Sequence, residues 1–134
     1  MLLLSKRKFE MNGIDFLADT NALIYLLNGN YCMTPYLQKR LSFSVISEME
    51  LLSFPGITQQ EEDSIKSLLQ DCTELSISSE IKKQTIEIRK KYRIKLPDAI
   101  VSASAIVNNI PLITADKGFR QIAELSLELL IPTI

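Results

Sequence analysis

Short apolar runs that suit buried strands alternate along this chain with longer segments of helical periodicity. The first run, IDFLADT at residues 14–20, predicts a buried strand that ends at Asp19, and a helix follows at residues 21–27. Further strands are predicted at residues 41–47, 73–78, 111–114 and 127–131, and helices at residues 35–40, 47–54, 58–71, 81–92, 97–109 and 118–125. Because strands alternate with helices, the sequence predicts a three-layer α/β/α domain around a mostly parallel sheet.

Two of the predicted helices differ in how they should pack. In residues 58–71, Ile65, Leu68 and Leu69 share one helical face with Cys72, which is typical of a helix on the surface. Residues 98–109 are apolar or small on nearly every side, which predicts a helix packed inside the domain.

The length and composition fit one ordinary globular domain. The chain has 134 residues, 46 % of them hydrophobic and 23 % charged, with a net charge of -1 that indicates no particular partner. We expect a domain at residues 14–134 and an N-terminal extension at residues 1–13. No apolar run is long enough to cross a bilayer or to form a secretory signal, so we expect a cytoplasmic protein. Cys32 and Cys72 lie far apart in the sequence, which favours free thiols over a zinc or redox pair.

Four acidic residues stand next to apolar segments at the ends of predicted elements. Asp19 and Asp116 follow predicted strands, and Glu50 and Asp98 lie in the first turns of predicted helices. Ligand sites of open α/β sheets form at the carboxyl ends of the strands. Carboxylates crowded there would raise each other's pKa, and a divalent cation with oxygen ligands would keep them ionised.

Each of these acids also has a simpler structural interpretation. Aspartate is a common helix N-cap, so each of the three aspartates could cap the helix that follows it. Glu50 fits an S-x-x-E capping box that starts at Ser47. Glu48 is a further candidate ligand, although its position near the predicted helix start favours a solvated role.

A basic run, RKKYRIK at residues 89–95, stands directly before Asp98. Such a run is most often a solvated helix end, where positive charge suits the helix dipole. Beside a metal site it would also attract a phosphodiester backbone. The candidate RNA-phosphate contacts are Arg89, Lys90, Lys91, Arg93 and Lys95.

Four segments together resemble a known family. FLADTNALIYLL, SVISEMELL, KLPDAIVSASAI and PLITADKGF occur in the order and spacing of PIN-domain ribonucleases, specifically the VapC-like toxins of type II toxin–antitoxin pairs. The resemblance implies a PIN-like fold from about residue 14 to the C-terminus. It also implies a catalytic, metal-binding set of Asp19, Glu50, Asp98 and Asp116, with Asn21 and Thr114 as polar supports.

The same resemblance implies an endoribonuclease that uses Mg²⁺ or Mn²⁺. The chain contains no histidine, so the most common general base is missing and water activated by a metal ion would take its place. We expect Asp19 and Asp98 to be the more direct ligands, with Glu50 and Asp116 acting through water or on a second ion. The implied partners are an RNA substrate, a cognate antitoxin whose C-terminal segment would cover the acidic groove, and a second copy of this chain.

Two other classes of function remain open from the sequence. A receiver-type signalling module also gathers acids around Mg²⁺. Such modules have adjacent acids after the first strand, whereas here Asp15 and Asp19 are separated by strand residues. A catalytically inactive PIN-like domain that only binds a partner would carry the same fold, with the acids serving as helix caps.

Overall fold

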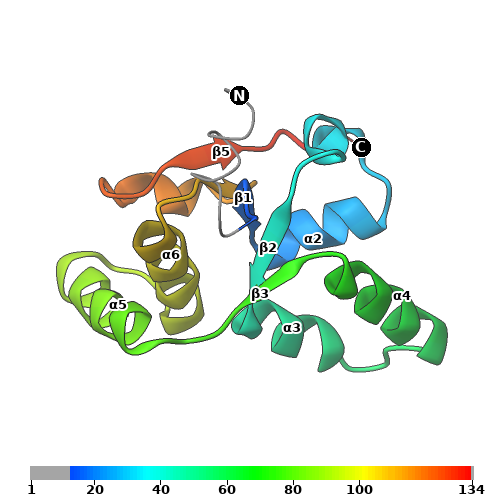
Figure 1. Cartoon of the computed structure of the whole chain (residues 1–134), viewed down its shortest axis with the longest axis horizontal. Coiled ribbons are helices and arrows are strands. Elements are labelled where there is room, and N and C mark those ends of the chain that lie inside the picture. The colour runs from blue at the N-terminus through cyan, green and yellow to red at the C-terminus, as the bar shows by residue number, and fades with distance from the viewer. Residues whose placement is uncertain (1–12, 134) are drawn as a thin grey trace, which may run out of the picture.

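Five strands form one sheet between two layers of helices in the computed structural model, which describes residues 13–133 (Figure 1). All pairings among these strands are parallel, in the order β3-β2-β1-β4-β5. The three-layer α/β/α fold predicted from the sequence is therefore confirmed. The strands are β1 (Phe16–Ala18), β2 (Leu41–Ser44), β3 (Thr73–Leu75), β4 (Leu112–Thr114) and β5 (Leu127–Leu129).

Helices cover both faces of the sheet. The α-helices are α2 (Thr20–Leu27), α3 (Val45–Leu52), α4 (Gln59–Gln70), α5 (Ser79–Lys91) and α6 (Leu96–Asn108), and two 3-10 helices are η1 (Tyr31–Tyr36) and η2 (Lys117–Gln121). Helices α5 and α6 lie on one side of the strands, and α2 and α4 on the other (Figure 1). Residues 1–12, most of the predicted extension, lie outside the described residues.

Alternating side chains of the central strands fill two separate cores. Leu17 of β1 and Leu112 of β4 pack with the residues of α5 and α6. Their neighbours Ala18 and Ile113 point to the opposite face and join the core beneath α2 and α4. This alternation follows from the two-residue period of a strand, and it fixes the register in which both strands end at the same edge.

Helix α6 is the buried helix that its composition predicts. Every residue from position 99 to 105 is buried, and three of the seven are alanines, which let the helix approach the sheet and α5 closely. The helix ends at Asn109, whose φ of 54° and ψ of 47° place it in the left-handed region. At the other end of the helix, Asp98 lies in the first turn.

Several predicted element boundaries were wrong. The strand predicted at residues 41–47 ends at Ser44, because the Ser44 hydroxyl accepts the backbone N–H of Ile46 and starts α3 at Val45. The helices predicted at residues 35–40 and 118–125 are short 3-10 helices at Tyr31–Tyr36 and Lys117–Gln121. No helix among residues 13–133 has the length and apolar character needed to cross a bilayer.

Candidate active site

The order of the strands reverses direction at β1, and two of the predicted acids stand at this point. From β1 the chain passes to β2 and β3 on one side, and then returns to β4 and β5 on the other. In open parallel sheets such a switch point leaves a crevice outside the carboxyl ends of the strands. Asp19 directly follows β1, and Asp116 stands two residues after β4.

Asp19 is a buried carboxylate with both oxygens engaged. It is the N-cap of α2, where its Oδ1 accepts the backbone N–H of Ala22 at 2.8 Å. Its Oδ2 accepts a short hydrogen bond from the Thr114 hydroxyl. Burial raises the pKa of Asp19 to about 6, the negative charges of Asp116 and Asp98 add to this rise, and the two hydrogen bonds oppose it.

Thr114 links the carboxylate of Asp19, after β1, to the backbone of Asp116, after β4. Its hydroxyl donates to Asp19 and accepts the backbone N–H of Asp116 at 3.0 Å. The Asp116 side chain in turn accepts the N–H of Gly118 at 2.8 Å and caps η2. The completely buried Thr114 therefore holds the backbone at Asp116 and the carboxylate of Asp19 together.

Asp98 approaches the same region from α6. It lies in the first turn of that helix and is partly buried, while the N-cap position belongs to Lys95. Burial raises the pKa of Asp98, and the negative charges of Asp116 and Glu50 raise it further, while the positive charge of Lys95 lowers it. The electrostatic coupling thus includes all four predicted acids, although each occupies a different element.

The local environment of Glu50 differs from the one predicted. Helix α3 begins at Val45, so Glu50 lies in its second turn and Ser47 is inside the helix, which rules out the predicted capping box. Instead, Ser47 and Glu50 are one turn apart, and both meet Thr20 of α2. Thr20 Oγ1 lies 2.6 Å from Glu50 Oε1 and 2.9 Å from Ser47 Oγ.

Two other predicted residues lie at the border of this site. Asn21 is exposed in the first turn of α2, and within residues 13–133 its side chain makes no hydrogen bond. Glu48 is the acidic residue in the first turn of α3. In the part of the chain that the structure describes, neither side chain makes a hydrogen bond to Asp19, Thr114 or Asp116.

The donor atoms of the site suit a hard divalent cation. They are carboxylate and hydroxyl oxygens, which Mg²⁺ and Mn²⁺ prefer over the nitrogen and sulfur ligands of softer metals. No three His, Cys, Asp or Glu side chains among residues 13–133 converge on one point. Mg²⁺ usually takes one or two carboxylates and keeps several waters, so an arrangement of mutually repelling but separated carboxylates fits such an ion.

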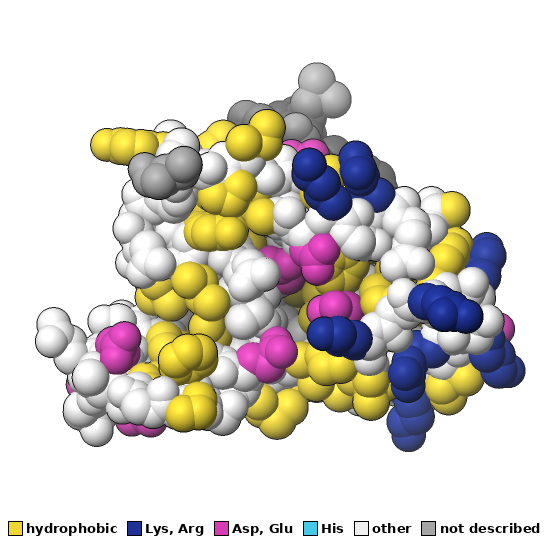
Figure 2. Space-filling model, turned by 180° about the vertical axis from the view of Figure 1, so that it is seen from behind, with side chains coloured by type: hydrophobic (Ala, Val, Ile, Leu, Met, Phe, Trp, Pro, Cys, Tyr) yellow, Lys and Arg dark blue, Asp and Glu magenta, His cyan; other side chains and the backbone are white. Residues whose placement is uncertain are grey.

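The predicted basic residues lie on the α5 side of the site. Arg89, Lys90 and Arg93 line a pocket of about 510 Å³ together with Tyr92 and Leu96. Lys91 is engaged elsewhere, since its Nζ lies 3.1 Å from Glu124. Figure 2 shows acidic side chains beside a hollow near the middle of one face, with Lys and Arg concentrated to one side of it.

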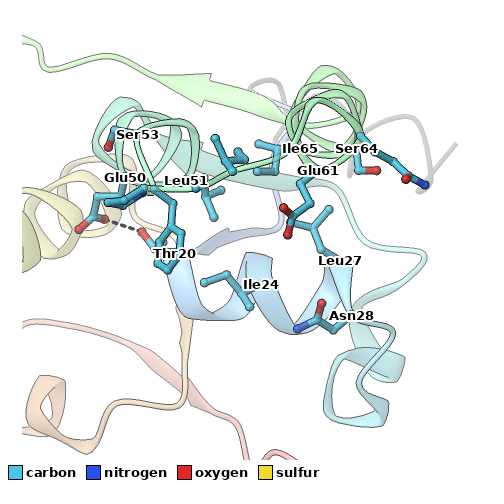
Figure 3. Close-up of a pocket in the computed structure, with 15 residues that line it drawn as sticks. Thr20, Ile24, Leu27, Asn28, Glu50, Leu51, Ser53, Glu61, Ser64 and Ile65 are labelled. Carbon is cyan, nitrogen blue, oxygen red and sulfur yellow. Dashed lines mark hydrogen bonds between the residues drawn. The ribbon is translucent and has the colours of Figure 1, made fainter.

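A larger pocket of about 930 Å³ opens between α2, α3 and α4 (Figure 3). Thr20 and Glu50 form part of its wall, so it adjoins the acidic site. Ile24, Leu51 and Phe54 give the pocket apolar surface, and its two ionisable residues, Glu50 and Glu61, are both acidic.

Sequence reasoning did not identify the contribution of Thr20 and Ser47. The sequence pattern places Ser47 at the start of a helix, whereas the helix begins at Val45, and it predicts no role for Thr20. The spacing of Ser47 and Glu50 is the signal that could have found them, because residues three apart share a helix face.

Comparisons with known proteins agree with the fold. The PIN domain family model matches residues 16–125. A toxin–antitoxin complex from Klebsiella pneumoniae is similar at 30% identity and a TM-score of 0.72, over 83% of this chain and 95% of that chain. VapBC2 from Rickettsia felis bound to a promoter DNA fragment has 21% identity and a TM-score of 0.77, over 87% of this chain and 98% of that chain.

VapBC-1 from nontypeable Haemophilus influenzae has 24% identity and a TM-score of 0.75, over 87% of this chain and 98% of that chain. No curated protein matches the sequence. The family match covers most of the chain, and the fold is similar to that of the VapBC structures. The chain therefore belongs to the PIN-domain family and is VapC-like.

Proposed function

We propose that this chain is a metal-dependent endoribonuclease and the toxin of a toxin–antitoxin pair. Membership of the PIN-domain family implies a nuclease in general terms. The observation that carries the finer proposal is the electrostatic coupling of Asp19, Glu50, Asp98 and Asp116 at the switch point of the sheet. Repelling carboxylates destabilise a fold, and binding a divalent cation would offset that repulsion.

Asp19 and Asp98 are the proposed direct ligands of Mg²⁺ or Mn²⁺, because they are the more buried of the acids whose charges repel one another. Glu50 and Asp116 contribute charge from the two flanks, through water or at a second ion. When bound, the cation supplies positive charge to the scissile phosphate and makes water acidic enough to act as the nucleophile. Thr114 keeps the Asp19 carboxylate turned toward the strand ends through its hydrogen bond.

The RNA backbone is proposed to approach across the basic side of the site. Arg89, Lys90 and Arg93 line one pocket, and Lys95 lies three residues before Asp98 in the sequence. Cations in this position would hold the phosphates on either side of the scissile bond, which the carboxylates alone would repel. Lys91 contributes less to this contact, because it is already paired with Glu124.

A cognate antitoxin and a second copy of the chain are the proposed protein partners. The VapBC structures that this chain resembles are toxin–antitoxin complexes. An antitoxin segment with a basic side chain would cover the acidic groove and compete for the carboxylates. The neighbouring pocket at Phe54 offers apolar surface and acidic side chains, which suits such a segment. The exposed apolar side chains, including Tyr31 and Ile131, provide surface for a homodimer.

The receiver-type alternative loses its support from the position of Asp15. This acid lies at the amino end of β1, where its carboxylate is 3.0 Å from the Arg40 guanidinium. It is therefore at the opposite end of the strand from Asp19 and cannot form a paired acidic site with it.

Cleavage of a mixed RNA pool tests the proposal directly. Purified protein free of antitoxin is assayed with Mg²⁺, with Mn²⁺ and with EDTA, alongside Asp98→Asn and the control Asp63→Asn. Asp63 is an exposed aspartate on α4, away from the site. We expect cleavage that requires the metal, is lost in Asp98→Asn and is retained in the control.

Equal activity in all three proteins would indicate a contaminating nuclease or a wrongly assigned site. No activity in any of them, with circular dichroism showing that each is folded, would favour an inactive domain that only binds a partner.

A further inference from the structure

A single threonine connects Glu50, an exposed acid of the site, to the helix that begins at the buried Asp19. Thr20 is the first residue of α2 and directly follows Asp19. Its hydroxyl oxygen lies 2.6 Å from Glu50 Oε1, and Figure 3 shows this contact across the gap between α2 and α3. The same oxygen lies 2.9 Å from the hydroxyl of Ser47, which is completely buried.

The direction of these hydrogen bonds follows from the donors available. A hydroxyl carries one hydrogen, and an ionised carboxylate can only accept. Thr20 therefore donates to Glu50, and the hydrogen of the Ser47 hydroxyl completes the contact between the two hydroxyls. The buried Ser47 hydroxyl thus orients the Thr20 hydroxyl, and the Thr20 hydroxyl orients the Glu50 carboxylate.

Glu50 depends on this contact more than Asp19 depends on any one partner. It is exposed on α3, and a long glutamate side chain there would sample several rotamers. The bond from Thr20 is the one hydrogen bond that its carboxylate makes within residues 13–133, and it leaves Oε2 without a donor. By contrast, Asp19 accepts two hydrogen bonds and is fixed as the cap of α2.

We propose that Thr20 is a positioning residue, which holds the Glu50 carboxylate so that Oε2 faces the divalent cation or its bound water. The inference rests on the proposed nuclease function and deepens it. The negative charge of Glu50 raises the pKa of Asp98, so the carboxylate that Thr20 holds belongs to the same acidic site as Asp98. If the hydrogen bond of Thr20 served only to join α2 to α3, its loss would lower the stability of the fold and leave metal binding unchanged.

The test compares Thr20→Val, which keeps the shape and removes the hydroxyl, with Thr20→Ser, which keeps the hydroxyl. Mn²⁺ binding to protein freed of metal is measured by titration calorimetry, RNA cleavage is measured over a range of Mn²⁺ concentrations, and thermal unfolding is followed in EDTA. We expect Thr20→Val to weaken Mn²⁺ binding by about tenfold, with a matching rise in the Mn²⁺ concentration for half-maximal cleavage. Thr20→Ser should restore both.

A Glu50→Gln variant provides the second measurement. If Thr20 acts through Glu50, then adding Thr20→Val to Glu50→Gln should weaken Mn²⁺ binding little further. Unchanged Mn²⁺ binding in Thr20→Val, with only a lower unfolding temperature, would overturn the positioning role while leaving the nuclease intact. A wild-type protein that binds Mn²⁺ but cleaves no RNA would instead reject the proposed function, and the Mn²⁺ affinity of Thr20→Val would still decide the role of Thr20.

Discussion

The two ends of strand β1 carry aspartates of opposite character. At the amino end, Asp15 accepts hydrogen bonds from the Arg40 side chain and backbone, and chiefly the side-chain bond lowers its pKa. At the carboxyl end, Asp19 has no cation among the causes of its pKa shift, and burial raises its pKa to about 6. Three residues separate these acids, yet one is neutralised by a partner and the other is buried among like charges.

This difference shows which acid serves the fold and which one makes it less stable. A buried carboxylate that remains unpaired is unfavourable, and sequences keep such groups mainly at sites that bind or react. The comparison therefore supports a structural role for Asp15 and the proposed functional role for Asp19, and it can be tested at both ends of the strand.

The largest expected effect is on RNA cleavage. Asp19→Asn should lower the rate by more than about 100-fold, because it removes the negative charge from a proposed direct ligand. Asp15→Asn should leave the rate unchanged, since its carboxylate lies at the opposite sheet edge. Single-turnover cleavage with saturating Mn²⁺ measures both, and a loss of activity in both variants alike would remove the distinction between the two ends.

The next effect is on the pH dependence of stability. With a pKa of 3.8 unfolded and about 6 folded, Asp19 binds more protons in the folded state between these values, so the free energy of unfolding falls as the pH rises from 4 to 6. The decrease attributable to Asp19 should approach about 3 kcal/mol. Urea unfolding in EDTA at pH 4 to 7 should show this decrease in the wild type and a weaker one in Asp19→Asn.

Subtracting the two curves gives the contribution of Asp19 together with its coupling to Asp98 and Asp116, because the other titrating groups occur in both proteins. If the free energy of unfolding changed with pH at the same slope in both proteins, Asp19 would not be held in an unfavourable charged state.

The contrast between paired and unpaired charges also applies to the cations. Arg93 has no ion pair within residues 13–133, whereas Lys91 is paired with Glu124 and lies over the ring of Tyr92. In EDTA, Arg93→Ala should weaken binding of single-stranded RNA severalfold and reduce its salt dependence by about 0.7 in the log–log slope. Lys91→Ala should have a smaller effect on both, and the reverse order would place the RNA on another surface.

Much of this arrangement could be predicted from the sequence, because it depends on local signals. The apolar runs that end at Asp19 and at Thr114 predict two strand ends, and parallel strands bring such ends to one edge. The environment of Glu50 could not be predicted in this way. Ser44 and Ser47 both offer a helix cap, and only the packed structure shows that the first of them is used.

The bonds that organise the site also join distant parts of the chain. Thr20 and Glu50 are 30 residues apart, and Asp19 and Thr114 are 95 apart. Periodicity describes one element at a time, so it shows which face a residue occupies within an element and not which residue of another element it meets. Thr114 was predicted as a support through the family resemblance, and its bond to Asp19 appears only in the fold.

The smallest expected effect concerns the paired end of β1. Asp15→Asn should lower the free energy of unfolding at pH 7 by less than about 1 kcal/mol, because the ion pair with Arg40 is partly exposed. The lowered pKa of Asp15 means that its contribution is present above pH 4 and is lost as the pH falls through the folded value. The difference in the free energy of unfolding between Asp15→Asn and the wild type should therefore shrink in acid and in 1 M salt, which screens exposed charges.

Urea unfolding under these conditions measures this difference, with Asp63→Asn as the control for a surface aspartate. A loss of several kcal/mol that salt does not reduce would show that Asp15 acts through its bond to the Arg40 backbone, and the two ends of the strand would then differ in geometry more than in charge.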